Sequence, residues 1–472
     1  MTLAKRVAKG VSWTAFSTVF RASLQIAQLV ILARFLQPAE LGVLALVNIV
    51  VGLAQIFTDA GLSNAIIYHK ELSQQRLKQL YLVNILFGGF IAIIVAATAF
   101  PVALFFDSPD LANLLLMLCP IFLIRSFGQQ PNALLQKKLD FQALSKIETL
   151  AAIWGFSALI SGLLIGWNLY AVILSQLVSA CILVVLLRLK VDCPLPCSFS
   201  IGWQENKQPF QYGLYQSGEA LVNYLSSQFD QLLLGKLLGV EVLGVYSYVK
   251  ALVFRPAMQL INPIVHRVTF PLMVKYKDTH GLADMYQRII HILGLINIPL
   301  YLGLALYPSW VLNLAFGESW VEHWEVLRWL ALYMLLISLV NPIGALLRAT
   351  GLVKRAFWWN VVVTIVRPVV VILSFNYGLV YLAKALFIQQ LILCFAHVFI
   401  LLKPACQLSL RRYCSTLVLP LSIFAFAYFT TRLATHFING LSDTGQIFIL
   451  AFTYILLLSP FINKIIKQIR QG

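Results

Sequence analysis

The 472-residue chain is 60% hydrophobic and 11% charged, and its mean hydropathy is +0.84. This composition excludes a soluble enzyme, because soluble domains carry about 25% charged residues. The formal net charge of +17 does not indicate nucleic-acid binding, since Lys and Arg form short clusters between apolar runs.

Apolar runs of 18 to 28 residues follow one another along the chain. A helix needs about 20 apolar residues to cross a bilayer, whereas a barrel strand needs about 10. The sequence therefore predicts an all-α polytopic membrane protein of about 14 transmembrane helices. They lie near 10–35, 40–66, 79–105, 110–135, 142–165, 168–189, 209–236, 241–266, 286–307, 324–347, 355–375, 378–402, 414–433 and 445–463.

The first run, preceded by Lys5, Arg6 and Lys9, is too long and too polar for a signal peptide, so we expect a retained span. Of the Lys and Arg residues between spans, 25 fall on one side, and only Arg34, Lys236 and Arg432 fall on the other. Short loops rich in these residues stay in the cytoplasm, so both termini are predicted to be cytoplasmic.

An internal repeat relates the outer turns after the first and seventh spans. At an offset of 202 residues, LARFLQPAELGVLALV from Leu32 aligns with LGKLLGVEVLGVYSYV from Leu234. The offset contains six spans, so the copies have the same orientation, as in transporters with parallel repeats. The predicted domains are a six-helix lobe at 1–190, a cytoplasmic linker at 191–207, a second six-helix lobe at 208–404, and two further helices with a tail at 405–472.

Charged residues inside spans mark functional sites in membrane proteins, because each costs at least about 2.5 kcal/mol to insert. Six cations, drawn from both lobes, are candidates for binding phosphate or pyrophosphate in a shared cleft: Arg21, Arg125, Lys250, Arg255, Arg367 and Lys384. Four acids are candidates for ion coupling or charge pairing: Asp59, Glu148, Glu219 and Asp230.

Alternative roles for these charges stay open. Each cation could instead pair with an acid, as Lys250 with Glu219, or extend to an interface, as Lys384 could. Asp59, near the end of its span, could equally cap a helix. Arg255 and Arg367 precede prolines, which could mark moving spans or only fit a bent helix into its bundle. We expect no metal site, disulfide or cofactor beyond a coupling proton or sodium ion.

Several stretches resemble the polysaccharide flippases of the multidrug/oligosaccharidyl-lipid/polysaccharide (MOP) exporter superfamily, closest to lipopolysaccharide and colanic-acid-type exporters. Besides the two repeat copies, these are FTDAGLSNAIIYHKEL from Phe57, PNALLQKKLDF from Pro131 and FGESW from Phe316. The resemblance implies two pseudo-twofold six-helix lobes in a V shape, with a central cavity that opens alternately to each side.

The same resemblance implies the function. An undecaprenyl-pyrophosphate-linked oligosaccharide would be flipped from the cytoplasmic to the periplasmic leaflet of the bacterial inner membrane for O-antigen, capsule or exopolysaccharide synthesis. Membrane lipids, a polysaccharide polymerase and chain-length machinery are the implied partners, and no nucleic acid is expected.

Two other functions are weighed against a flippase. An ion-coupled multidrug antiporter on the same fold would favour an acidic or aromatic cavity, which the excess of buried cations opposes. A polymerase or ligase of lipid-linked sugars would need a large outer loop. The longest outer break, 308–323, carries Glu318, Glu322 and His323, and we expect it to be a solvated loop and not a catalytic site.

Overall fold

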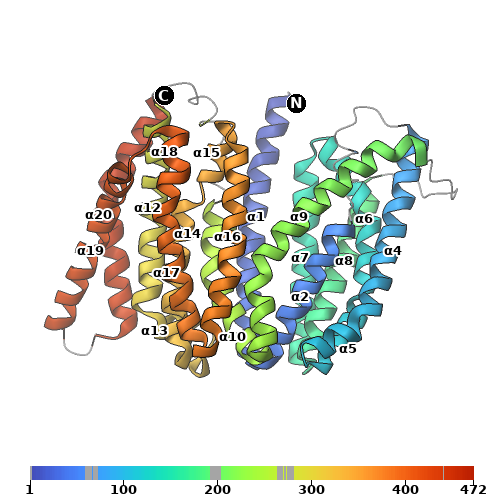
Figure 1. Ribbon diagram of the computed structural model, residues 1–472, viewed down its shortest axis with the longest axis horizontal. Helices are drawn as coiled ribbons and strands as arrows, with labels where there is room; N and C mark the ends of the chain where they lie inside the picture. Colours follow the sequence, from blue (N-terminus) through green and yellow to red (C-terminus); the bar gives the residue numbers. More distant parts are fainter. Residues whose placement is uncertain are drawn as a thin grey trace. The chain divides into compact units, whose positions relative to one another are not determined.

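The computed structural model describes residues 3–58, 73–191, 203–262, 281–438 and 441–471, with positions 66, 269 and 273. These residues are overwhelmingly helical and include no strand (Figure 1). The chain packs as two compact units, unit 1 at residues 1–248 and unit 2 at residues 249–472.

Unit 1 contains the helices α1 (Leu3–Phe35), α2 (Pro38–Thr58), α4 (Gln74–Phe105), α5 (Pro109–Leu118), α6 (Pro120–Lys137), α7 (Phe141–Leu164), α8 (Leu169–Lys190), α9 (Trp203–Leu237) and most of α10 (Gly239–Arg255). Unit 2 continues with η1 (Pro256–Ile261), α12 (Leu282–Leu306), α13 (Pro308–Ala315), η2 (Glu318–His323), α14 (Trp324–Val340), α15 (Ile343–Ala349), α16 (Val353–Ser374), η3 (Phe375–Tyr377), α17 (Leu379–His397), η4 (Val398–Leu402), α18 (Lys403–Cys406), α19 (Leu410–Phe437) and α20 (Asp443–Gln471).

The predicted membrane-spanning, all-helical class is confirmed. Within the described ranges, 12 helices are long and apolar enough to cross a membrane, and each coincides with a predicted span. The two other predicted spans fall on α9 and on α10 with η1, which are helical as expected. One predicted span, 110–135, is divided into α5 and α6 where Pro120 follows Cys119, because proline cannot donate a helical backbone hydrogen bond.

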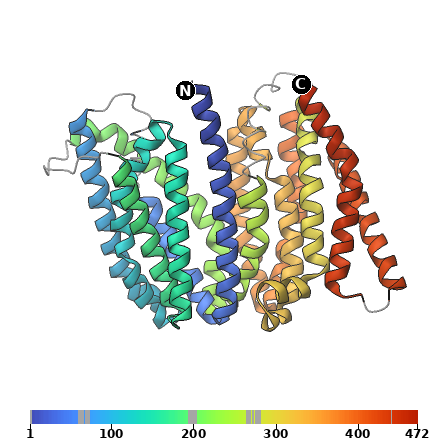
Figure 2. The same ribbon diagram turned by 180° about the vertical axis from the view of Figure 1, so that it is seen from behind.

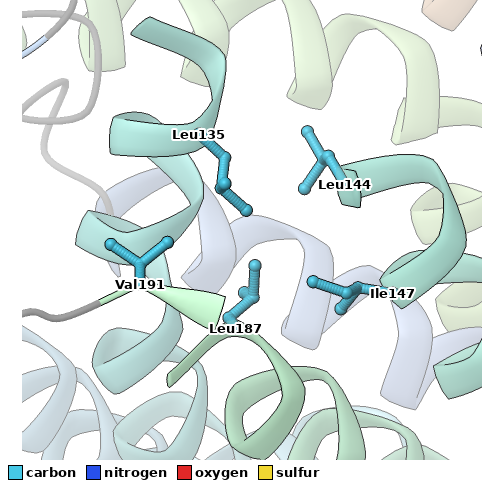
Figure 3. Packing of buried hydrophobic residues seen from close by; sticks show 5 residues of the cluster. All are labelled: Leu135, Leu144, Ile147, Leu187 and Val191. Carbon is cyan, nitrogen blue, oxygen red and sulfur yellow. The ribbon is translucent and has the colours of Figure 1, made fainter. Parts of the chain in front are cut away.

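An apolar cluster joins α6, α7 and α8 in unit 1. Leu135, Leu144, Ile147, Leu187 and Val191 are each less than a tenth exposed and point toward one another (Figure 3). Further along, α7 packs along both α8 and α1, and α1 and α7 lie side by side in Figure 2. This packing fixes the position of α1, which carries the candidate Arg21.

The two copies of the sequence repeat contact each other within unit 1. A Cβ atom added at Gly42 would lie 2.6 Å from the carbonyl carbon of Val240 and closer still to its oxygen. At Gly244 the added atom would lie 2.9 Å from the carbonyl carbon of Pro38, again closer to the oxygen. The four residues form two pairs separated by the same 202-residue offset, so the contact itself is pseudo-twofold. Glycine permits this approach of two backbones, as small residues do between membrane helices.

The contact between α2 and α9 extends away from this glycine pair. Tyr224 of α9 donates a hydrogen bond to the carbonyl oxygen of Ile49, at 3.0 Å. The Tyr224 ring packs directly against Gly52, because a Cβ atom added at Gly52 would lie only 2.7 Å from Tyr224 Cζ. At the other end of α9, Lys236 Nζ lies 3.1 Å from Asp107 Oδ2. Helix α9 is therefore held to α2 by the Tyr224 contacts and to the turn between α4 and α5 by an ion pair.

In unit 2, α12 packs against α14 and α19, α14 packs against α17, and α16 lies against α17. The hairpin α19–α20 borders α12 (Figure 1). Gln287 Nε2 donates to the carbonyl oxygen of Arg412 at 3.1 Å, and Tyr454 donates to the carbonyl oxygen of Leu295 at 2.8 Å. The hairpin is therefore fastened to α12 by hydrogen bonds at several levels.

The boundary between the packing units falls inside α10, whereas the predicted linker lies at 191–207. Helix α9, in the predicted second lobe, packs with the helices of unit 1. Residues 192–202 of the linker lie outside the described residues. The lobe boundaries deduced from the repeat stay a prediction.

Candidate functional site

Arg21 forms an ion pair between α1 and α7. Its Nη1 lies 2.8 Å from Glu148 Oε2, and about a quarter to a third of each side chain is exposed. The Arg21 Nε also donates to the carbonyl oxygen of Ser17, at 3.4 Å. Of the two roles considered for Glu148, the geometry shows charge pairing.

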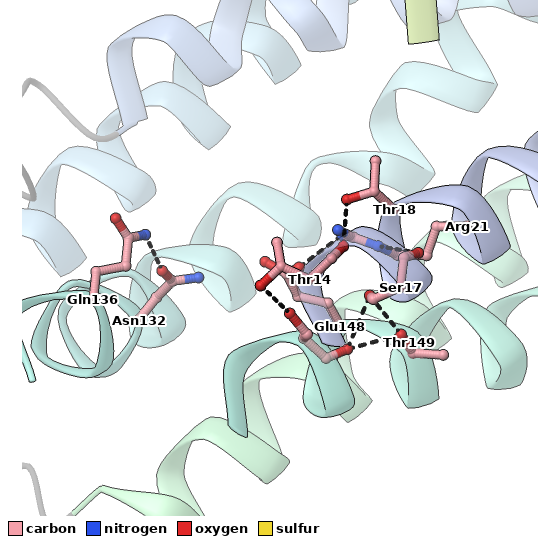
Figure 4. Close-up of polar contacts among 9 residues, drawn as sticks. Thr14, Ser17, Thr18, Arg21, Asn132, Gln136, Glu148 and Thr149 are labelled. Atoms are coloured by element: carbon pink, nitrogen blue, oxygen red, sulfur yellow. Dashed lines mark hydrogen bonds and ion pairs between the residues drawn. The ribbon is translucent and has the colours of Figure 1, made fainter. Parts of the chain in front are cut away.

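Hydroxyl groups surround this pair. Ser17 Oγ and Thr149 Oγ1 are 2.8 Å apart, Ser17 donates to the carbonyl oxygen of Ser145, and Ser145 donates to Thr14 (Figure 4). A partly buried ion pair with hydroxyl neighbours is solvated by the protein from several sides, so its desolvation is partly offset. The α1–α7 interface is therefore polar in the middle of two membrane spans.

Arg125 differs from Arg21, because it makes no ion pair or hydrogen bond with any described residue. It is half-buried on α6. Gln129, Asn132 and Gln136 follow it at helical spacings of four, seven and eleven residues, so the four share one face of α6. Gln136 donates to Asn132 at 2.6 Å (Figure 4), and Gln129 Oε1 is buried without a hydrogen-bond partner among the residues of the described ranges. This polar face presents a cation with unused donors.

Three further candidate cations lie half-buried in unit 2, and each makes contacts. Lys250 lies on α10. Arg255 is the last residue of α10, where Pro256 begins the π-helical turn η1. Arg367 lies in α16, which continues through Pro368. The proline after Arg255 thus changes the helix type, whereas the proline after Arg367 does not interrupt its helix.

Lys384 of α17 lies beside a carboxylate that was not among the sequence candidates. Its Nζ is 3.6 Å from Glu325 Oε2 of α14 and lies over the rings of Tyr381, at 5.2 Å, and Trp329, at 5.7 Å. Glu325 stands at the predicted start of its span, where an acid is ordinarily assigned to the helix end. Trp329 lies in an apolar run, five residues before Met334, so nothing in the sequence predicted a contact with a charged residue there.

Arg328 is a second charged residue that the sequence analysis missed. It lies in α14, donates from Nε to the carbonyl oxygen of Ala305 at 3.1 Å, and stacks on the Trp324 ring at 4.5 Å. The spacing of Trp324 and Arg328 by four residues, one helical turn, was the available signal. Both contacts place it in a structural role between α12 and α14.

Of the three remaining candidate acids, the structure describes the side chain of Asp230 but not those of the other two. Asp230 of α9 is 2% exposed and accepts a 2.6 Å hydrogen bond from Tyr246 of α10, which is itself fully buried. Asp59 and the side chain of Glu219 lie outside the described residues. Asp230 therefore joins α9 to α10, and the proposed pair of Lys250 with Glu219 stays a prediction.

The outer break 308–323 is helical and not the expected loop. It folds as α13 and η2, with Phe316 2% and Trp320 3% exposed. Burial of these two aromatic rings, 4.8 Å apart between centroids, fixes the segment against the neighbouring helices α12 and α14. Glu322 and His323 are 3.4 Å apart on η2. The loop expectation is wrong because burial of these rings takes nearby backbone groups out of water, and the helical turns satisfy those groups.

The candidate cations thus fall into distinct groups. Arg21 and Lys384 have carboxylate neighbours, Arg125 has none among the described residues, and the other three make contacts of their own. Arg21 and Arg125 lie in unit 1, and the others lie in unit 2. Convergence of all six on one cavity stays a prediction.

Known proteins match this chain over most of its length. The family described as "Polysaccharide biosynthesis protein" matches residues 31–325, more than half of the chain. The lipopolysaccharide biosynthesis protein WzxC of Escherichia coli (strain K12) is 31% identical over 425 residues, which are 89% of this chain and 86% of that protein. The teichuronic acid biosynthesis protein TuaB of Bacillus subtilis (strain 168) is 30% identical over 363 residues, or 76% and 74% of the two chains.

Solved structures match the fold. The lipid II flippase MurJ, in an inward closed conformation, has a TM-score of 0.71 at 14% identity, covering 96% of this chain and 99% of that one. An inward-facing multidrug resistance MATE family transporter of the MOP superfamily has a TM-score of 0.61 at 16% identity, covering 81% and 96%. The chain is therefore a multi-pass membrane transporter that belongs to the polysaccharide biosynthesis protein family and has the fold of the MOP exporter superfamily.

Proposed function

We propose that the protein flips an undecaprenyl-pyrophosphate-linked oligosaccharide from the cytoplasmic to the periplasmic leaflet of the bacterial inner membrane, with both termini in the cytoplasm. The names of the two relatives, for lipopolysaccharide and for teichuronic acid biosynthesis, support a polysaccharide precursor as cargo. A transporter that carries such a cargo needs no catalytic residue, and the polymerase that extends the polymer would be its partner.

The single observation that carries the proposal is the state of Arg125. A half-buried guanidinium with no ion pair or hydrogen bond to any described residue keeps all five N–H donors available. Guanidinium groups bind phosphate oxygens through two parallel hydrogen bonds. Gln129, Asn132 and Gln136 on the same face supply further donors for phosphate or for sugar hydroxyls. Arg125 is accordingly the first candidate for the pyrophosphate contact.

Alternating access would follow from rocking of the two lobes, as in other transporters built from repeats. The backbone contact of Gly42 with Gly244 and its neighbours supports a pivot or gate at the outer turns, because the contact joins corresponding positions of the two repeats. Energy coupling to a proton or sodium ion stays part of the proposal, with Asp59 and Glu219 as candidate acids.

A genetic test addresses cargo and residue separately. Deletion of the gene in its host should abolish the surface polysaccharide and leave lipid-linked repeat units on the cytoplasmic side of the membrane. Arg125→Ala should complement this deletion poorly and Arg125→Lys partly, while the exposed Arg411→Ala at the start of α19 should complement fully at matched membrane levels. Full complementation by Arg125→Ala would refute the phosphate role, and precursors that reach the periplasmic face in the deletion strain would refute the flippase.

A further inference from the structure

A groove lies between α16 and α17 in unit 2. Its volume is about 600 Å³. Helix α16 packs mainly against α17 and α15, and only 6% of its most apolar stretch is buried by protein. The groove therefore lies on a face of α16 and α17 that the other helices of unit 2 leave uncovered.

The lining of the groove changes in character along its length. Tyr377, Tyr381 and Lys384 line the end near the turn from α16 to α17, and Val366, Val370 and Ile392 line the far part. Aromatic rings and a lysine are typical of the headgroup level of a bilayer, whereas branched apolar side chains are typical of the acyl-chain level. The charge distribution of the sequence assigns the turn to the outer leaflet.

Gln389 occupies the middle of the groove. It is 6% exposed, and neither its amide nitrogen nor its amide oxygen has a hydrogen-bond partner in the part of the chain that the structure describes. Burying an unsatisfied amide costs about 1–3 kcal/mol, so buried amides are almost always paired. Gln389 lies five residues beyond Lys384, about 7.5 Å deeper along the helix axis. A ligand with a hydrogen-bond acceptor at that depth would satisfy the amide.

We propose that this groove binds an anionic glycerophospholipid of the outer leaflet, such as phosphatidylglycerol. Its phosphate lies at Lys384, a glycerol ester carbonyl accepts a hydrogen bond from Gln389, and an acyl chain runs along Val370 and Ile392. A polyprenyl phosphate has only hydrocarbon below its phosphate and leaves the Gln389 amide unpaired. This ligand is a bound membrane lipid and not the transported cargo, so the inference does not depend on the proposed function.

Glu325 modulates the site, because its carboxylate lies 3.6 Å from Lys384 Nζ. A bound phosphate and this carboxylate compete for the same ammonium group. An exposed ion pair of this kind contributes about 0.2–1 kcal/mol. Glu325→Gln should therefore strengthen binding of phosphatidylglycerol by about 1.4- to 5-fold.

The test measures lipid binding to the purified full-length protein by native mass spectrometry, with phosphatidylglycerol, phosphatidylethanolamine and undecaprenyl phosphate as probes. Phosphatidylglycerol should bind best. Lys384→Gln should remove its preference over phosphatidylethanolamine, and Gln389→Leu should weaken both diacyl lipids by about 2- to 12-fold, the value of one hydrogen bond. Ala385→Phe, which fills the groove lining without removing a polar group, should abolish binding.

Matched controls come from the same helices. Gln390→Leu removes a neighbouring buried amide that already lies 3.8 Å from Cys394 Sγ and does not line the groove. Lys354→Gln removes an exposed lysine at the opposite end of α16. Neither should change lipid binding. Equal binding of undecaprenyl phosphate, or a Gln389→Leu variant that behaves like Gln390→Leu, would overturn the proposal.

Discussion

Substitution of Gly42 by alanine tests whether the repeat contact controls the conformation of the transporter. The added Cβ would start 2.6 Å from the carbonyl carbon of Val240, and real Cβ atoms essentially never approach such atoms within 3.0 Å. The backbones of α2 and α10 must therefore separate by more than 0.4 Å, and by more again for the carbonyl oxygen. No flexible side chain is available to move instead, since the obstacle is backbone.

Overpacking of this kind costs about 1–3 kcal/mol. If the contact exists in one transport state only, that energy shifts the balance of states by about 5- to 150-fold toward the state in which the helices are apart. Gly244→Ala acts on the same joint from the other repeat. Once one substitution has separated the backbones, the second should cost less, so the double variant should show a smaller effect than the sum of the singles.

The assay is a distance distribution between spin labels at the exposed Gln37 and Glu241, on either side of the joint, in a cysteine-free background. Both single variants should populate a longer distance between the two labels. Transport should slow in proportion to the population of that longer distance. The control is Gly89→Ala in α4, where only Leu123 lies as near as 4.0 Å and alanine favours the helix. An unchanged distance in Gly42→Ala, or additive effects in the double variant, would refute a shared pivot.

Two further predictions concern charged residues that join neighbouring helices. Arg21→Glu should lower the stability of the protein in detergent by about 1–3 kcal/mol because it places two carboxylates together, and adding Glu148→Arg should restore that stability. Thermal unfolding measures the stability. Transport by the swapped variant decides whether the cation itself binds cargo. Tyr246→Phe should destabilise the protein by about 1–3 kcal/mol, because it removes a hydrogen bond to the buried Asp230. The same unfolding assay measures the change. A stability equal to that of the parent protein would show that another donor replaces the tyrosine.

Hydropathy was sufficient to predict the spans, because bilayer thickness sets the length of each apolar run independently of what packs against it. The repeat that begins at Leu32 and Leu234 could also be recognised from the sequence, and its structural counterpart is the Gly42–Gly244 contact. The glycines were visible as matched residues. Their close approach was not, since it depends on how α2 and α10 meet in three dimensions.

The candidate site was less accessible to sequence reasoning. Each intramembrane cation could be recognised from its unfavourable insertion energy, but its partner could not. Glu148 pairs with Arg21 across 127 positions of sequence, and Glu325 approaches Lys384 from another helix. Gln389 gave no signal at all, because an amide in an apolar run becomes informative only when its polar atoms are seen to be buried without a hydrogen bond to any described residue.

The hairpin of α19 and α20 meets the other helices of unit 2 largely along one helix, α12, through the hydrogen bonds made by Gln287 and Tyr454. A segment attached along a single seam can be gained, lost or elaborated during evolution while the helices beneath it keep their packing. The seam is thus a natural place for a fused domain to be tolerated.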